Sequence, residues 1–183
     1  MRPSFPCMAS PLGSSAAAPA ALRLVIGLGN TLRSDDGAGA LLARHAARWC
    51  RSRTAGGLRP DPAGMAPAAL VVRWLQQLTP ELAADLSRSD AVLFLDAWHA
   101  PRGARPSLMR LAPSAPALQS HRLEPAALLA LSEGLYGRAP RAWLLRIPAG
   151  CFGHGTALSA ALRARLPEAQ ALLEQWLRLH APA

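Results

Sequence analysis

The fold of this chain is decided by the stretch Leu24-Val25-Ile26-Gly27-Leu28-Gly29-Asn30-Thr31-Leu32-Arg33-Ser34-Asp35-Asp36-Gly37. A short apolar strand ends in a glycine turn, and two adjacent carboxylates follow just before a predicted helix. This order places acidic oxygens at the carboxyl end of a strand, which is where α/β proteins keep their sites. Asn30 is the only asparagine in the chain, and this singles out the turn further.

Length and composition indicate one globular domain. The chain has 183 residues, of which 51% are hydrophobic and 17% are charged, and such a chain can bury a sizeable core. It contains no lysine, so all 20 basic residues are arginines, and the net charge is +9. The arginines are dispersed and are not interleaved with aromatic residues, a pattern typical of GC-rich codon usage. We therefore expect no nucleic-acid partner, although a basic, non-enzymatic adaptor stays an alternative.

The cysteines and the N-terminal segment bear on the compartment. Cys7, Cys50 and Cys151 are far apart and lack CxxC spacing, so they suggest neither disulfides nor a zinc site and fit the reducing cytoplasm. No apolar run approaches the length of a membrane span, and no membrane contact is expected. Residues 1–21 are rich in Pro, Ser and Ala and predict a disordered tail rather than a signal peptide. The predicted α/β domain covers residues 22–180.

Predicted strands and helices alternate through this domain. The expected strands are Leu22–Gly27, Leu70–Trp74, Ala91–Leu95, Ser107–Leu111 and Ala142–Ile147, with the fourth at a sheet edge. The expected helices are Gly37–Cys50, Thr79–Arg88 with Thr79 as N-cap, Pro125–Leu135, and a final pair, Ser159–Arg165 and Pro167–His180, separated by Pro167. A long surface loop is expected at Arg51–Ala69. The alternation predicts a three-layer α/β/α sandwich around a mostly parallel sheet.

Acidic and imidazole side chains are predicted to converge at one edge of this sheet. Asp35 and Asp36 follow the first strand, Asp96 ends the third, and His121 lies in the loop after the fourth. Each lies in a connection that leaves the carboxyl end of a strand, so all can face one crevice. Carboxylates and imidazole form a mixed ligand set for a divalent ion such as nickel or zinc, and three protein ligands leave one coordination position open.

Each of these residues also has an ordinary structural explanation. An aspartate after the first strand can complement the N-terminus of a helix. Asp96 can cap a turn, and His121 alone can be a simple loop histidine. Their shared location is what favours a functional interpretation.

Several common chemistries are excluded by the sequence. The Gly27-x-Gly29 turn lacks the third glycine of a dinucleotide fingerprint, because Leu32 takes its place. Without lysine, neither a Walker-type phosphate loop nor Schiff-base catalysis can be built. The chain has no HExxH helix and no GxSxG elbow. A Rossmann-like protein that binds a nucleotide or a small metabolite at the glycine turn stays an alternative.

Taken together, the motifs resemble the hydrogenase maturation proteases, the endopeptidases that finish the large subunit of nickel–iron hydrogenases. The resemblance runs from about residue 22 to residue 177, and its motifs occur in the family's order: Gly27–Leu32 with Asp35–Gly39, then Leu93–Ala97, Ser120–Leu123 and Gly155–Ser159. It implies a twisted five-stranded sheet between helices.

The resemblance also implies a site and a substrate. Its metal-contacting and catalytic trio falls on Asp36, Asp96 and His121. Family members recognise nickel that is already installed in the large-subunit precursor and then cut off a short C-terminal extension. Nickel is therefore expected as part of the substrate, and the implied partner is a hydrogenase large-subunit precursor, met in the cytoplasm by a monomer of this chain. Either carboxylate could act as the general base that activates water.

Overall fold

One sheet forms the centre of the protein. The computed structural model describes residues 22–54, 69–115 and 122–180, so the predicted tail (residues 1–21) and the predicted site residue His121 lie outside the described residues. Five strands are present in the described part: β1 (Leu22–Leu28), β2 (Ala69–Leu75), β3 (Ala91–His99), β4 (Ser107–Leu111) and β5 (Arg141–Ala149). Their order in the sheet is β2-β1-β3-β5-β4. All pairings are parallel except that of the edge strand β4 with β5, so the predicted mostly parallel sheet and the edge position of the fourth strand are confirmed.

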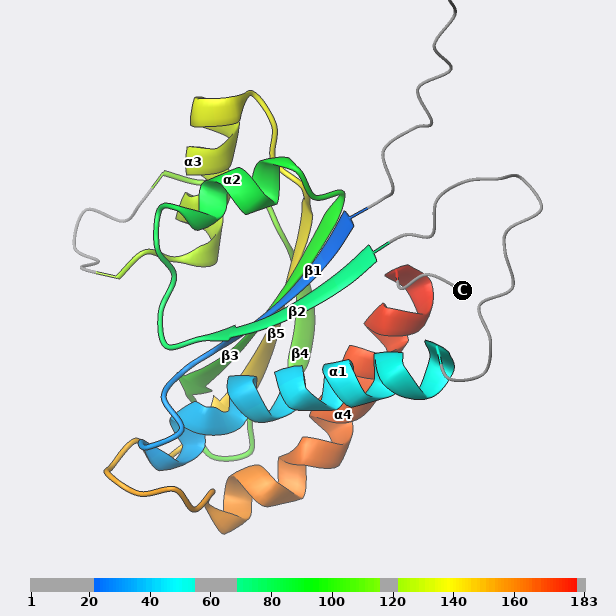
Figure 1. Cartoon of the computed structure of the whole chain (residues 1–183). Helices are drawn as coiled ribbons and strands as arrows, with labels where there is room; N and C mark the ends of the chain where they lie inside the picture. Colours follow the sequence, from blue (N-terminus) through cyan, green and yellow to red (C-terminus); the bar gives the residue numbers. More distant parts are fainter. Residues whose placement is uncertain (1–21, 55–68, 116–121, 181–183) are drawn as a thin grey trace, which may run out of the picture.

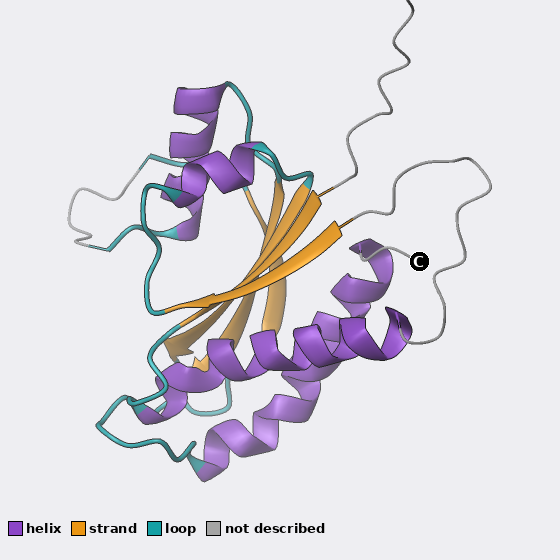
Figure 2. Cartoon of the chain, in the orientation of Figure 1, coloured by secondary structure: helices purple, strands orange, loops and turns teal. Residues whose placement is uncertain are grey.

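Helices cover both faces of the sheet (Figures 1 and 2). One face packs against α1 (Ala38–Thr54), which follows the short 3-10 turn η1 (Ser34–Gly37), and against α4 (Ala160–His180). The other face packs against α2 (Leu82–Ser87) and α3 (Pro125–Tyr136). A separate apolar cluster fills each interface, which confirms the three-layer sandwich. None of the described helices is both long enough and apolar enough to cross a membrane.

The central strands are apolar along most of their length because both of their faces are covered. On β3, Leu93 faces α1 and α4 while Phe94 faces α2 and α3, and both side chains are fully buried. A continuous apolar run of this kind is typical of a parallel strand inside an α/β protein. Burial of each large side chain contributes about 1.5–3 kcal/mol to stability. The strands β1 and β3 are therefore firmly held, and so are the segments that follow their carboxyl ends.

Two glycines allow β1 and α1 to approach each other closely. A side-chain carbon on Gly27 would lie 2.3 Å from the carbonyl oxygen of Gly39, and one on Gly39 would lie 2.1 Å from the carbonyl oxygen of Leu28. No other residue fits at either position without moving the backbone. The close approach holds the beginning of α1, and therefore η1, against the carboxyl ends of β1 and β3.

The last helix differs from its prediction. The sequence predicts two helices separated by Pro167, but a single helix, α4, runs through this proline. Proline removes one backbone hydrogen bond and crowds the carbonyl group four residues earlier, at Arg163. Both residues are exposed, so water can solvate the freed carbonyl. The buried side chains of Leu173 and Trp176 meanwhile hold the helix on the sheet.

Other boundaries also differ from their predictions, and helix α1 continues to Thr54, into the predicted loop. The helix expected from Thr79 begins at Leu82, because residues 79–82 form a turn in which the Leu82 amide donates to the Thr79 carbonyl oxygen. Strand β3 continues to His99 instead of stopping before Asp96, because β5 pairs with it along its whole length. Asp96 therefore lies inside a strand, near its carboxyl end, and not in the connection that follows.

Candidate active site

The turn between β1 and η1 fixes the position of Asp36. Gly29 has a φ of 120°, and a side chain there would lie 1.9 Å from the carbonyl oxygen of Asp36, so only glycine fits. The amide of Asn30 donates to Asp36 Oδ2 at 2.9 Å, while Asn30 Oδ1 accepts from the amide of Leu32 at 2.9 Å. One glycine and the only asparagine of the chain thus hold this carboxylate in place.

Asp96 lies on β3, the strand next to β1. Its burial raises the pKa of Asp96 to about 6; Arg122, the Ala97 amide and Arg146 act in the opposite direction, and the negative charge of Asp36 adds to the rise. The structure therefore brings Asp36 and Asp96 close enough to interact electrostatically. Interacting carboxylates in which one pKa is raised are common in acid–base sites.

An arginine stacked on an indole borders Asp96. Arg146 on β5 is the register partner of Asp96 on β3, so both side chains lie on the same face of the sheet. The guanidinium carbon of Arg146 lies 3.9 Å from the centre of the Trp98 ring, a cation–π contact. Within the described part of the chain, the buried Trp98 Nε1 has no hydrogen-bond partner. The sequence prediction misses Arg146 and Trp98 because it ends the third strand at Asp96. The two-residue spacing places Trp98 on the same face as Asp96 only if the strand continues.

Asp35, by contrast, has a structural role. Its fully buried carboxylate accepts hydrogen bonds from the amides of Gly150, Cys151 and Ser159 and from the Ser159 hydroxyl, at 2.7–3.1 Å. Burial alone would raise the pKa of Asp35, but the hydrogen bonds from Ser159, Gly150 and Cys151 outweigh it, and the pKa is lowered. Asp35 therefore ties η1 to the segment before α4, whereas its neighbour Asp36 stays partly exposed.

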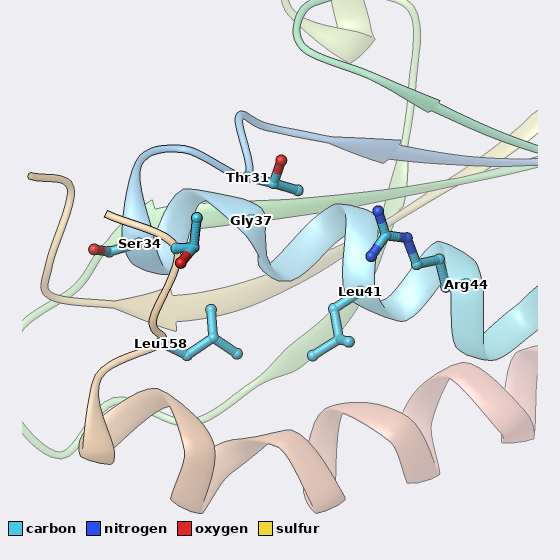
Figure 3. A pocket seen from close by; sticks show the side chains of 7 residues that line it. Thr31, Ser34, Gly37, Leu41, Arg44 and Leu158 are labelled. Carbon is cyan, nitrogen blue, oxygen red and sulfur yellow. The ribbon is translucent and has the colours of Figure 1, made fainter. Parts of the chain in front are cut away.

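A depression opens beside the Asp36 turn (Figure 3). It has a volume of about 300 Å³ and is lined by Thr31, Ser34, Gly37, Leu41, Arg44, Thr156 and Leu158. Two of its lining residues, Ser34 and Gly37, flank Asp36 within η1. The depression therefore begins at the candidate site and extends along α1.

The described part of the predicted metal-contacting trio consists of two carboxylates. In residues 22–54, 69–115 and 122–180, no three His, Cys, Asp or Glu side chains lie close enough together to hold a metal ion. The predicted third member, His121, is outside these ranges. The oxygens of Asp36 and Asp96 suit a divalent cation, and an added imidazole would suit nickel.

The glycine turn is not built to bind phosphate. Four of its amides are occupied within the protein: Gly29 donates to the Leu75 carbonyl, Asn30 to the Asp36 carboxylate, Leu32 to the Asn30 side chain and Arg33 to the Asn30 carbonyl. A phosphate-binding turn needs free amides that point at the ligand. The Asp36 carboxylate beside the turn would also repel an anion, and this counts against the nucleotide-binding alternative.

Comparisons with known proteins give a match in structure but not in sequence. No protein-family model matches the chain, and no curated protein does. The hydrogenase maturating endopeptidase HybD from E. coli is similar with a TM-score of 0.62 and 19% identity, over 87% of this chain and 94% of that one. The nickel–iron hydrogenase maturation protease HycI from Thermococcus kodakarensis KOD1 gives 0.58 and 19%, over 88% and 93%. An endopeptidase from Escherichia coli gives 0.57 and 20%, over 85% and 91%. The chain therefore has the fold of the hydrogenase maturation endopeptidases.

Proposed function

We propose that this chain is an endopeptidase that removes the C-terminal extension of a nickel-loaded hydrogenase large-subunit precursor. The observation that carries the proposal is that Asp36, in the turn after β1, and Asp96, near the end of the neighbouring strand β3, lie close enough to interact electrostatically. The pair lies in a fold shared with endopeptidases named for hydrogenase maturation. The sequence motifs that contain these two residues also resemble those of the hydrogenase maturation proteases, and this resemblance does not depend on the fold.

In this proposal nickel belongs to the substrate. Asp36 and Asp96, with His121, would contact the nickel ion that the precursor carries, through two carboxylates and an imidazole. Only a loaded precursor can offer these contacts, so the binding energy that positions the scissile bond is available only after nickel has been inserted. The enzyme would therefore cut loaded precursor and spare empty precursor.

Peptide hydrolysis further needs a general base that takes a proton from the attacking water and a general acid that gives a proton to the leaving amine. We assign these roles to Asp36 and Asp96. The substrate's metal ion would polarise the water or the scissile carbonyl group. Arg146, stacked on Trp98 beside Asp96, supplies a fixed positive charge that would stabilise negative charge developing on the carbonyl oxygen.

The basic-adaptor alternative receives less support from the structure. Several arginines are paired with acidic residues, namely Arg73 and Arg88 with Asp85, Arg105 with Glu168, Arg138 with Asp90, and Arg178 with Glu174. These pairs are distributed over different elements and do not gather on one face. A nucleic-acid surface would instead concentrate unpaired arginines in one patch.

A mobility-shift assay tests the proposal. Nickel-loaded and nickel-free large-subunit precursor from the same organism are incubated with the wild type, Asp36→Asn, Asp96→Asn or Asp90→Asn. The wild type should shorten only the loaded precursor, and the first two variants should leave it uncut. Asp90 pairs with Arg138 before β3, at the other end of that strand, so Asp90→Asn is the matched control and should process normally. Cleavage of empty precursor, or full activity without Asp36, would contradict the proposal.

We further propose that the enzyme acts as a monomer in the cytoplasm and uses neither a membrane nor a nucleic acid. Sedimentation of the purified chain, alone and after addition of precursor, measures its oligomeric state. A stable dimer that persists at the concentration of the assay would contradict the first part. Processing by the purified chain in a solution without lipid or nucleic acid would support the second.

A further inference from the structure

The depression beside Asp36 has the chemistry of a groove for an amphipathic side chain (Figure 3). Leu41 on α1 and Leu158 before α4 point into the same space and form its apolar part. Hydroxyl groups come from Thr31, Ser34 and Thr156, and among the described residues that line the depression Arg44 alone is charged. We call these six residues, together with Gly37, the Arg44 groove. Its volume of about 300 Å³ is at the lower end of the range for small-molecule sites.

The two walls of the Arg44 groove are tied together by backbone hydrogen bonds. The Ser34 amide donates to the Gly155 carbonyl oxygen at 2.7 Å, and the Gly155 amide donates to the Leu32 carbonyl oxygen at 2.9 Å. Ser34 adopts the left-handed region with a φ of 49°, a conformation that non-glycine residues keep only when their surroundings hold them in it. The groove is therefore formed before any ligand arrives.

Arg44 is positioned relative to Asp36 through a short chain of contacts. Its guanidinium carbon lies 5.7 Å from the centre of the Trp74 ring. The Trp74 indole N–H donates to the carbonyl oxygen of Gly29 at 3.0 Å, and Gly29 belongs to the turn that holds Asp36. No ion pair among the described residues includes Arg44. The groove thus offers a guanidinium group that contacts Trp74 and has no acidic partner among the described residues.

The length of the helix separates the backbone of Arg44 from the Asp36 turn. Gly37 and Arg44 are seven residues apart, which corresponds to about 10 Å along the helix axis between their Cα atoms. An extended peptide covers that distance in about three residues. An anionic group at the Arg44 end would therefore be far enough from Asp36 to avoid strong repulsion in a partly solvated groove.

We propose that the Arg44 groove binds an acidic side chain of the precursor, about three residues from the scissile bond. The leucines would contact the aliphatic part of that side chain, and Arg44 would bind its carboxylate through charge-assisted hydrogen bonds. This inference rests on the proposed function and adds a rule of substrate selection to it. Arg44 is a binding residue in this scheme and takes no part in the hydrolysis.

The test compares two arginines of the same helix. Arg44→Gln should raise KM for nickel-loaded precursor about tenfold with kcat unchanged, because the lost contact forms equally in the bound and transition states. Arg48→Gln removes the same charge one turn further along α1, at an exposed position outside the groove, and should change KM less than about twofold. Thermal unfolding of both variants checks that the fold is unchanged.

A scan of the precursor then locates the partner. Each acidic residue within about five positions of the cleavage site is replaced singly by its amide, on either side of the bond. One replacement should raise KM of the wild type about tenfold and have no further effect on Arg44→Gln, the result expected of a directly coupled pair.

The outcomes separate the inference from the function on which it rests. Equal effects of Arg44→Gln and Arg48→Gln, or no coupled acidic residue in the precursor, would overturn the inference while wild-type cleavage keeps the proposed function intact. Failure of the wild type to cut loaded precursor would overturn the proposed function itself, and the inference with it.

Discussion

Replacing Asp96 by Asn should make the protein more stable and inactive at the same time. Burial raises the pKa of Asp96 from 3.8 to about 6, so its ionised form is less favourable in the folded protein than in the unfolded chain. Asparagine has nearly the same shape and carries no charge, so Asp96→Asn removes this cost. It also removes a carboxylate from the pair on which the proposed reaction depends.

The size of the gain follows from linkage between protonation and folding. A rise in pKa from 3.8 to about 6 corresponds to about 3 kcal/mol of lost stability when Asp96 is ionised. The variant should therefore gain about 3 kcal/mol above pH 6. As the pH falls from 6 towards 3.8, the folded wild type binds a proton that the unfolded chain does not yet bind, so the wild type recovers stability. The gain of the variant should shrink through this interval and vanish below it.

Urea unfolding of both proteins at about pH 7.5 and about pH 4.5 measures this difference. The control is Asp90→Asn, which removes a partly exposed carboxylate that pairs with Arg138 and should cost between about 0 and 1 kcal/mol. If Asp96→Asn were no more stable than the wild type at the higher pH, the argument that burial opposes the ionised form would be refuted. A gain that did not depend on pH would refute it equally.

Three further substitutions test other parts of the structure. Asp35→Ala should destabilise the fold by about 3 kcal/mol or more, because it removes a buried carboxylate that accepts hydrogen bonds from Gly150, Cys151 and Ser159. The pKa of Asp35 is lowered from 3.8, so this contribution should be present above pH 3.8 and lost as the pH falls through the lower folded value. Acid titration followed by circular dichroism measures the loss. Gly29→Ala should cost about 2 kcal/mol or more, because the φ of Gly29 is positive and the added methyl carbon would lie 1.9 Å from the carbonyl oxygen of Asp36. Processing should also be lost, and a soluble variant with normal activity would contradict this. Pro167→Ala should stabilise the protein by about 2 kcal/mol by restoring a hydrogen bond inside α4, and an unchanged melting temperature would show that the helix already tolerates the proline.

The turn that carries Asp36 can be predicted from sequence because its determinants are local. Glycine at position 29, the side chain of Asn30 and a carboxylate six residues further on are enough to specify it. The alternation of strands and helices is similarly visible in the apolar pattern. These features need no information from distant parts of the chain.

The features that could not be predicted from sequence depend on residues that are distant in the chain. Asp35 and Asp36 are chemically identical neighbours, and Asp35 becomes structural only because Gly150 and Ser159, more than a hundred residues away, donate to it. The extension of β3 past Asp96 likewise depends on β5, and the place of Arg146 in the site depends on that pairing. The contribution of His121 stays a prediction.

The way in which Asp35 holds the segment before α4 has a consequence for how selectivity can change. One side chain secures both ends of the stretch from Cys151 to Ser159, and the residues between them include Thr156 and Leu158 of the groove wall. Between these ends, side chains can vary without moving the backbone as long as Gly155 keeps its hydrogen bonds to Leu32 and Ser34. Substrate choice could therefore diversify by replacement of this short stretch while the reacting carboxylates keep their positions.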